Sequence, residues 1–251
     1  MPKSQAQEPV SNAVTVEAKP ASIRLELRKT AVIVVDMQND FGSEGGMFHR
    51  AGIDISPIQA AVAPTARVLT AARNAGVKVI YLKMGFRPDL SDLGTADSPN
   101  RARHLLFGVG QPVQTPEAGE GHCLIRDTWN TEILPQLSPH TEDVVIYKHR
   151  FSGFYQTELD DILQRQGVKY LIVTGCTTSV CVESTIRDAM FRDYCCLLLE
   201  DCTAEPIGND LPRSNHAASL LTIQTLLGWV STSQKFIRAI EQPVTASATV
   251  A

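Results

Sequence analysis

The stretch AVIVVD at residues 31–36 predicts a β-strand that is buried on both of its faces. Its apolar residues, most of them β-branched, follow one another without the alternation of polar residues that a half-exposed strand would show. Such continuous runs are typical of parallel sheets that helices cover on both sides. The run ends at Asp36, so it also places a carboxylate at the carboxyl end of a predicted strand.

Strand-like and helix-like segments alternate through the rest of the chain. Further short apolar runs predict strands at residues 77–82, 144–147, 170–173 and 195–199. Segments with apolar residues at helical spacing lie near residues 62–75, 157–166, 180–193, 214–227 and 231–240. Alternation of this kind, with right-handed crossovers, predicts an α/β fold: a three-layer α/β/α sandwich around a mostly parallel central sheet.

Two residues limit the first of these helices. Pro64 predicts that the regular helix begins there or is kinked, because proline has no N–H for the helical ladder. Gly76 lies where the apolar spacing stops, and glycine is the usual residue just after a helix.

The domain limits follow from the composition of the two ends. Residues 1–25 and 242–251 show no sustained periodicity, and we expect both to be disordered tails around one domain at residues 26–241. Within the domain, the stretch from Met84 to Pro139 is too long for a plain connection. We expect it to line a site or to contact a neighbouring subunit.

Composition excludes several classes of protein. The 251 residues are 43% hydrophobic and 20% charged, which is typical of a globular domain. A net charge of −4, without a cluster of Lys and Arg, disfavours a nucleic-acid partner. No apolar run reaches the length of about 18 residues that a membrane span requires, so no membrane partner is expected.

The cysteines predict a reducing environment. All six of them occur in a long chain. The first 25 residues lack a basic start followed by an apolar block, so we expect no secretory signal. Free thiols in the cytoplasm are therefore expected rather than three disulfides, which leaves a thiol available for chemistry.

Three reactive side chains lie at or just beyond the ends of predicted strands: Asp36, Lys148 and Cys181. Ligands of open parallel sheets bind outside the carboxyl ends of the strands, so the topology is expected to bring these residues to one edge. Each has a plainer explanation when taken alone. Cys181 could be a small buried apolar residue, Asp36 a loop cap and Lys148 an exposed strand end.

Cys181 has the setting of a nucleophile. Ser179 is a candidate N-cap, which would place Cys181 in the first turn of a helix. The helix dipole and the free N–H groups there would lower the pKa of the thiol and could hold an oxyanion. A nearby lysine would stabilise the thiolate, and a carboxylate could carry its proton.

The sequence resembles the cysteine hydrolase branch of the isochorismatase-like superfamily over about residues 27–240. Three motifs carry the resemblance: VVDMQNDF at 34–41, YKHR at 147–150 and GCTTSVCV at 175–182. The resemblance implies a catalytic triad of Asp36, Lys148 and Cys181. It also implies a cis peptide bond between Cys176 and Thr177, with the N–H groups of Thr177 and Cys181 as the oxyanion hole.

Within this superfamily the resemblance disfavours two alternatives. Isochorismatase proper lacks the cysteine, which argues against vinyl-ether chemistry here. Nicotinamidases usually carry an Asp-x-His metal signature where this chain has MGFRPD at 84–89, and the six histidines lack zinc-type spacing. We therefore expect neither a metal nor a cofactor.

The resemblance also points to a class of substrate. RFSGFYQT at 150–157 and GWVS at 228–231 are similar to ureidoacrylate amidohydrolases of pyrimidine breakdown, whereas RPDL at 87–90 is similar to biuret hydrolases. The implied substrate is a small ureido or carbamoyl compound; biuret and N-carbamoylsarcosine remain alternatives. The candidate substrate-binding residues are Asn39, Phe41, Arg87, Arg150, Tyr155 and Gln224.

Two other readings stay open. The pairs Gly108/Gly110 and Gly119/Gly121 lack the third glycine and the strand–helix context of a dinucleotide site, so an oxidoreductase is a weak alternative. A catalytically silent binding or scaffold protein of the same fold is the alternative from another class. By resemblance we expect a homo-oligomer, a dimer or tetramer, whose neighbouring subunits could complete the pocket.

Overall fold

A computed structural model describes residues 13–116 and 118–242 of the chain. Its centre is a six-stranded sheet in the order β10-β9-β8-β3-β4-β7, in which every neighbouring pair is parallel. The strands are β3 (Thr30–Val35), β4 (Lys78–Met84), β7 (Val144–Lys148), β8 (Tyr170–Cys176), β9 (Cys195–Ala204) and β10 (Trp229–Ser231).

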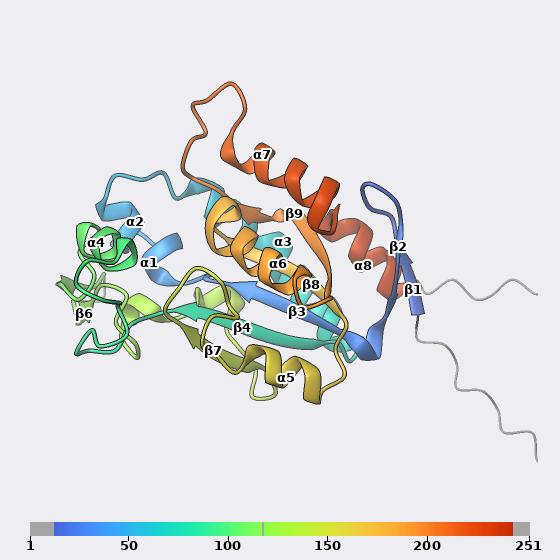
Figure 1. Ribbon diagram of the computed structural model, residues 1–251, viewed down its shortest axis with the longest axis horizontal. Helices are drawn as coiled ribbons and strands as arrows, with labels where there is room; N and C mark the ends of the chain where they lie inside the picture. The colour runs from blue at the N-terminus through green and yellow to red at the C-terminus, as the bar shows by residue number, and fades with distance from the viewer. Residues whose placement is uncertain (1–12, 117, 243–251) are drawn as a thin grey trace, which may run out of the picture.

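Helices cover both faces of this sheet (Figure 1). On one face α3 (Ser56–Asn74) and α8 (Ser233–Glu241) pack on side chains such as Val32 and Val34 of β3. On the other face α5 (Leu159–Arg165), α6 (Glu183–Met190) and the π-helical turn η5 (Ile223–Leu227), which continues α7 (Asn215–Thr222), lie over Ile33 and Val35. All six residues of β3 are buried, as the unbroken apolar run predicted, and the three-layer sandwich is confirmed.

The N-terminal region differs from the expected disordered tail. Strands β1 (Ala13–Val16) and β2 (Ile23–Glu26) form an antiparallel pair whose alternate side chains, among them Val16 and Leu25, are buried in the core. The prediction is therefore wrong for residues 13–25, where two short segments with a period of two residues form strands. Residues 1–12 and 243–251 of the two predicted tails lie outside the described residues.

Helix α3 begins earlier than predicted. Ser56 is its first residue and Pro57 lies in its first turn, a position where the missing N–H costs nothing. The helix then includes Pro64 and ends at Asn74. Gly76 follows with φ of 70°, which confirms the predicted end of the helix at a glycine in the left-handed region.

The stretch between β4 and β7 folds over the carboxyl ends of the strands. It contains α4 (Pro99–Leu106), the antiparallel pair β5 (Pro112–Gln114) and β6 (Glu120–His122), and the 3₁₀ turns η2 (Trp129–Thr131) and η3 (Pro135–Leu137). Figure 1 shows α4 beside α1 (Asn39–Gly42) and α2 (Met47–Arg50), at the end of the sheet to which β3 points. A third 3₁₀ turn, η1 (Leu27–Lys29), joins β2 to β3 at the opposite end.

Two general expectations can be compared with the described part of the chain. All six cysteines are free, as predicted. None of the helices in residues 13–116 and 118–242 has the length and apolar character that crossing a membrane would require.

Candidate active site

Asp36 and Lys148 meet above the end of β4, although they come from different strands. Asp36 follows β3 with φ of 51°, and its N–H donates to the Leu82 carbonyl at 2.9 Å. Lys148 is the last residue of β7 and lies opposite Met84 in the register of the sheet. Its Nζ reaches across β4 to donate to Asp36 Oδ2 at 2.7 Å, and to the Arg150 carbonyl at 3.3 Å. The predicted convergence of these two strand ends is confirmed.

Cys181 completes the group from the other side of β3. β8 ends at Cys176, and the chain then forms the π-helical turn η4 (Thr178–Val182) that carries Cys181. The Cys176–Thr177 peptide bond is cis, as the family resemblance implied. Cys176 does not line the cavity next to Cys181, and its buried Sγ donates to the Asp36 carbonyl at 3.1 Å.

The predicted cap at Ser179 is wrong. The turn begins after Thr177, and no side chain caps it. Instead the N–H and the hydroxyl of Ser179 both donate to Glu205 Oε2, at 2.8 and 2.5 Å. The short turn is therefore held by a buried carboxylate rather than by its own N-cap.

The pKa of the Cys181 thiol is raised, the opposite of the shift that the sequence predicted. Burial is the largest cause and the Asp36 charge adds to it, while Lys148 acts in the other direction. The prediction relied on a helix dipole, but the cysteine lies in a buried five-residue turn and beside a carboxylate. Cys181 is thus a protonated thiol at neutral pH, and its use as a nucleophile requires a base.

Asp36 has the properties of that base. Burial raises its pKa, and the charge of Lys148 opposes this rise. Burial alone would lower the pKa of Lys148, but the negative charge of Asp36 and the hydrogen bond to it raise that pKa, so the lysine stays protonated. Asp36 Oδ1 is buried without a hydrogen bond of ordinary geometry to any described residue, and the Cys181 thiol is near enough to lower the Asp36 pKa. That oxygen is available to the thiol proton.

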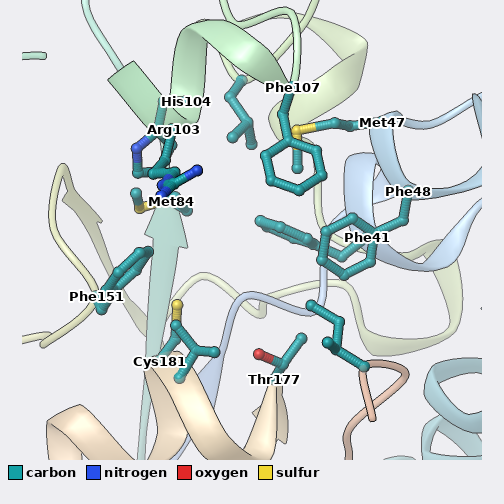
Figure 2. Close-up of a pocket in the computed structure, with 13 residues that line it drawn as sticks. Phe41, Met47, Phe48, Met84, Arg103, His104, Phe107, Phe151, Thr177 and Cys181 are labelled. Carbon is teal, nitrogen blue, oxygen red and sulfur yellow. The ribbon is translucent and has the colours of Figure 1, made fainter. Parts of the chain in front are cut away.

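Cys181 and Thr177 form one wall of a cavity of about 150 Å³. Figure 2 shows the Cys181 sulfur pointing into this space, with Arg103, His104 and Phe107 across from it. The remaining wall is apolar and consists of Phe41, Met47, Phe48, Met84, Leu124, Phe151, Val180 and Ile207. The stretch between β4 and β7 therefore lines a site, which was one of the two roles expected for it; the other was contact with a neighbouring subunit.

Of the predicted substrate-binding residues, the structure brings only Phe41 to the cavity wall. Asn39 is buried, donates to the Trp129 carbonyl and accepts from Ser43, so it holds α1 in place. The Arg150 guanidinium donates to the carbonyls of Asp92 and His149 and lies over the ring of Tyr155.

The other two candidates are also elsewhere. Arg87 is exposed on the loop after β4. Gln224 is half-buried in η5, within the helical layer. Neither lines the cavity.

Sequence reasoning missed the lining residues that come from α4, from its C-cap and from α2, including Arg103, His104, Phe107 and Phe48. One signal for α4 was present. Ser98 caps this helix by accepting from the Arg101 N–H, and Pro99 follows it in the first turn. A Ser-Pro pair is a common helix start, so the sequence does contain a signal for α4.

A second network holds the Cys181 turn from behind. Thr203 Oγ1 donates to the Gly175 carbonyl at 2.7 Å, so Thr178 must use its own hydroxyl proton on Thr203, 3.0 Å away. The remaining contact of Thr178, 3.0 Å from His216 Nδ1, then requires that His216 donates. Together with Glu205, these residues attach both Thr178 and Ser179 to β9 and α7.

No three His, Cys, Asp or Glu side chains in residues 13–116 and 118–242 are grouped as metal ligands would be. The reactive groups at the site are a thiol, a carboxylate and an ammonium group.

Comparisons with known proteins identify the family. Residues 30–235 match the family described as the isochorismatase domain. The chain is 37% identical over 238 residues to the ureidoacrylate amidohydrolase RutB of Rhizobium rhizogenes, covering 95% of this chain and 94% of that protein. It is 38% identical over 226 residues to RutB of Acinetobacter baylyi, covering 90% and 89%.

Two solved structures extend the likeness. A cysteine hydrolase from Pseudomonas syringae pv. phaseolicola superposes with a TM-score of 0.74 and 32% identity, covering 94% of this chain and 99% of that one. N-carbamoylsarcosine amidase from Thermoplasma acidophilum superposes with a TM-score of 0.60 and 25% identity, covering 82% of this chain and 96% of that one. The fold, the domain match and the identity over most of the chain establish that this protein belongs to the isochorismatase domain family of hydrolases.

Proposed function

We propose that this protein is a cysteine-dependent amidohydrolase that cleaves a C–N amide bond of a small ureido or carbamoyl compound similar to ureidoacrylate. One observation carries the proposal: a buried Asp36–Lys148 pair, 2.7 Å apart, stands beside a thiol that opens into a cavity. The relatives named as ureidoacrylate amidohydrolases support the choice of substrate.

The first half of the reaction forms an acyl-enzyme. Asp36 accepts the Cys181 proton as the sulfur attacks the carbonyl carbon, and the carbonyl oxygen becomes an oxyanion. The N–H groups of Thr177 and Cys181 hold that oxyanion. Asp36 then returns the proton to the leaving nitrogen, the C–N bond breaks, and ammonia or an amine departs from a thioester.

The second half restores the enzyme. Asp36 accepts a proton from a water molecule, which attacks the thioester carbonyl, and the sulfur leaves as the thiol when it takes the proton back. The product is a free acid or a carbamate. Lys148 keeps its proton throughout and stabilises the charge of Asp36 in the steps in which the carboxylate is ionised.

The likeness to N-carbamoylsarcosine amidase keeps a carbamoyl amino acid as a second candidate substrate, ahead of biuret. Free thiols favour a reducing compartment such as the cytoplasm. A role in pyrimidine degradation and a homo-oligomeric state are proposed from the family resemblance of the sequence motifs.

The test is ammonia release from ureidoacrylate, N-carbamoylsarcosine, biuret and nicotinamide. We expect activity on a ureido or carbamoyl compound that Cys181→Ala abolishes. Cys195→Ala is the matched control, because Cys195 is half-buried in β9 and does not line the cavity. Equal activity of the two variants would refute Cys181 as nucleophile, and a folded native protein inactive on the whole panel would favour the silent binding protein.

A further inference from the structure

The cavity above Cys181 is suited to a flat apolar group. Its wall includes the rings of Phe41, Phe48, Phe107 and Phe151, and the first two pack edge to face with centroids 5.0 Å apart. An apolar cavity of about this volume, 150 Å³, engineered in another protein stays dry and binds benzene. Phe107 and Phe151 are 39% and 42% exposed, so a ligand in the cavity would cover apolar surface that is now open.

Arg103 is the one cation on this wall, among the residues that the structure describes. It is exposed, and its guanidinium makes no ion pair or hydrogen bond with a described residue. His104 is uncharged at neutral pH because burial lowers its pKa, and its ring lies between Phe86 and Phe151. Lys148 is engaged with Asp36. An anion that enters the cavity therefore has Arg103 as its partner.

The two ends of the cavity are chemically different. Figure 2 shows Cys181 and Thr177 on one side and Arg103 on the other, with the aromatic rings between them. A ligand that satisfies all of these groups carries a reactive carbonyl, a flat apolar body and a carboxylate, in that order. Arginine is well suited to the last group because its planar fork donates two parallel hydrogen bonds to a carboxylate.

We propose, on the basis of the function proposed above, that the substrate is an amide or ureide whose scissile carbonyl meets Cys181, whose flat apolar body fills the cavity and whose carboxylate pairs with Arg103. A ureidoacrylate has these groups in this order, with an alkene as the body. The ring-lined space accepts a larger body as well, so the site is expected to prefer conjugated or aromatic acids of this design.

The same geometry disfavours biuret. Biuret is polar along its whole length and has no carboxylate, so most of its N–H and C=O groups would lose their water against phenylalanine and methionine side chains. Each polar group buried without a partner costs on the order of a tenfold loss of affinity or more. Arg103 would also be left without a counter-ion.

The test measures binding to a protein that cannot turn over, so that it does not depend on catalysis. We would titrate Cys181→Ala with three probes by calorimetry: trans-cinnamate, which has the flat body and the charge; cinnamyl alcohol, which has the body alone; and succinate, which has charge without a ring. We expect cinnamate to bind most tightly. Adding Arg103→Gln should lower the affinity for cinnamate roughly tenfold or more and leave the affinity for cinnamyl alcohol unchanged.

Arg101→Gln is the matched control, because Arg101 lies on the same helix and does not line the cavity. Cinnamate affinities that fall equally in the Arg101 and Arg103 variants would overturn the role of Arg103. Succinate binding as tightly as cinnamate, or no binding of cinnamate, would overturn the apolar body. These outcomes are separate from a failure of the proposed function, which would appear as missing Cys181-dependent ammonia release in the native protein.

Discussion

Lys148 Nζ donates a hydrogen bond to Asp36 Oδ2 at 2.7 Å, and neither side chain is more than 1% exposed. Two charges buried in this way lose most of their hydration, and each is kept ionised mainly by the other. Such a pair contributes little to stability compared with apolar residues of the same volume. The Asp36–Lys148 pair lies beside the thiol of Cys181, so we attribute it to catalysis rather than to stability.

Lys148→Met tests this pairing. The substitution leaves Asp36 buried without a counter-ion, so the Asp36 pKa rises further and the carboxyl takes up a proton near neutral pH. We expect kcat/KM to fall by a factor of about 10²–10⁴, the usual contribution of a general base. Breaking a buried pair is also expected to cost about 3–5 kcal/mol in the free energy of unfolding, measured with urea.

The double variant Asp36→Asn with Lys148→Met separates the two effects. Because it removes both charges, it should regain much of the lost stability while staying inactive. A double variant as unstable as Lys148→Met would contradict the pairing, and so would a Lys148→Met protein with native activity.

The pH dependence of kcat/KM follows from the two shifted acids. Asp36 must be ionised to accept the thiol proton, and burial raises its pKa, so activity should fall on the acid side at a pH above the ordinary aspartate value of about 3.9. The pKa of Cys181 is also raised, so no gain that follows thiolate formation is expected near pH 8.5. Rates from pH 4 to 9 would report the apparent values of the coupled group. A rise centred near pH 8.5 would instead indicate a preformed thiolate.

Linkage gives the corresponding sign for stability. A raised pKa in the folded state means that the folded Cys181 keeps its proton when the unfolded thiol would lose it. Its contribution to stability is therefore complete below about pH 8.5, the unfolded value, and is lost as the pH rises toward the folded value. The free energy of unfolding of Cys181→Ala, measured with urea, should therefore fall less than that of the native protein as the pH rises above about 8.5.

Glu205→Gln tests the network behind the nucleophile. Oε2 of this buried carboxylate accepts from Ser179, and Oε1 accepts from the Ile207 N–H at 3.1 Å. A glutamine must turn its NH₂ group toward one of these donors, whichever way it is placed. We expect kcat to fall about tenfold and to fall more than KM rises, because the Cys181 turn shifts by a fraction of an ångström while most of the cavity wall, which lies on other elements, keeps its place. 

Glu200→Gln is the control for this change, since Glu200 lies on β9, which ends one residue before Glu205, and makes no hydrogen bond to the turn among the described residues. Kinetics on both variants would decide the matter. A loss confined to KM, or an equal loss in both, would argue against positioning by Glu205.

The parts of the molecule differed in how far the sequence could predict them. β3 and its end at Asp36 were predictable because a strand buried on both faces needs an uninterrupted apolar run. The end of β7 at Lys148 was predictable from its short apolar run, although this edge strand is only partly buried. Arg103 and Phe107 were not, because α4 has only eight residues and its role depends on where the loop folds back. The raised pKa of Cys181 was also missed, since burial of the turn is a tertiary property that outweighs any local dipole.

Gly175→Ala tests how closely β8 must approach β3 beside the site. Gly175 has φ of 113°, and a Cβ there would lie 2.0 Å from the carbonyl oxygen of Val35. Val35 is the residue just before Asp36. Backbone cannot yield at that distance, so β8 must move away from β3, and Cys181 moves with it. We expect a loss of more than about 3 kcal/mol of unfolding free energy, or activity at least tenfold lower in the protein that does fold.

Gly167→Ala is the control: its φ of 64° is also left-handed, but nothing lies within 4 Å of the added Cβ. That variant should lose only about 1–2 kcal/mol and keep its activity. If the two variants behaved alike, the effect would come from backbone strain alone, and the close contact of β8 with β3 would not be what fixes the distance between Asp36 and Cys181.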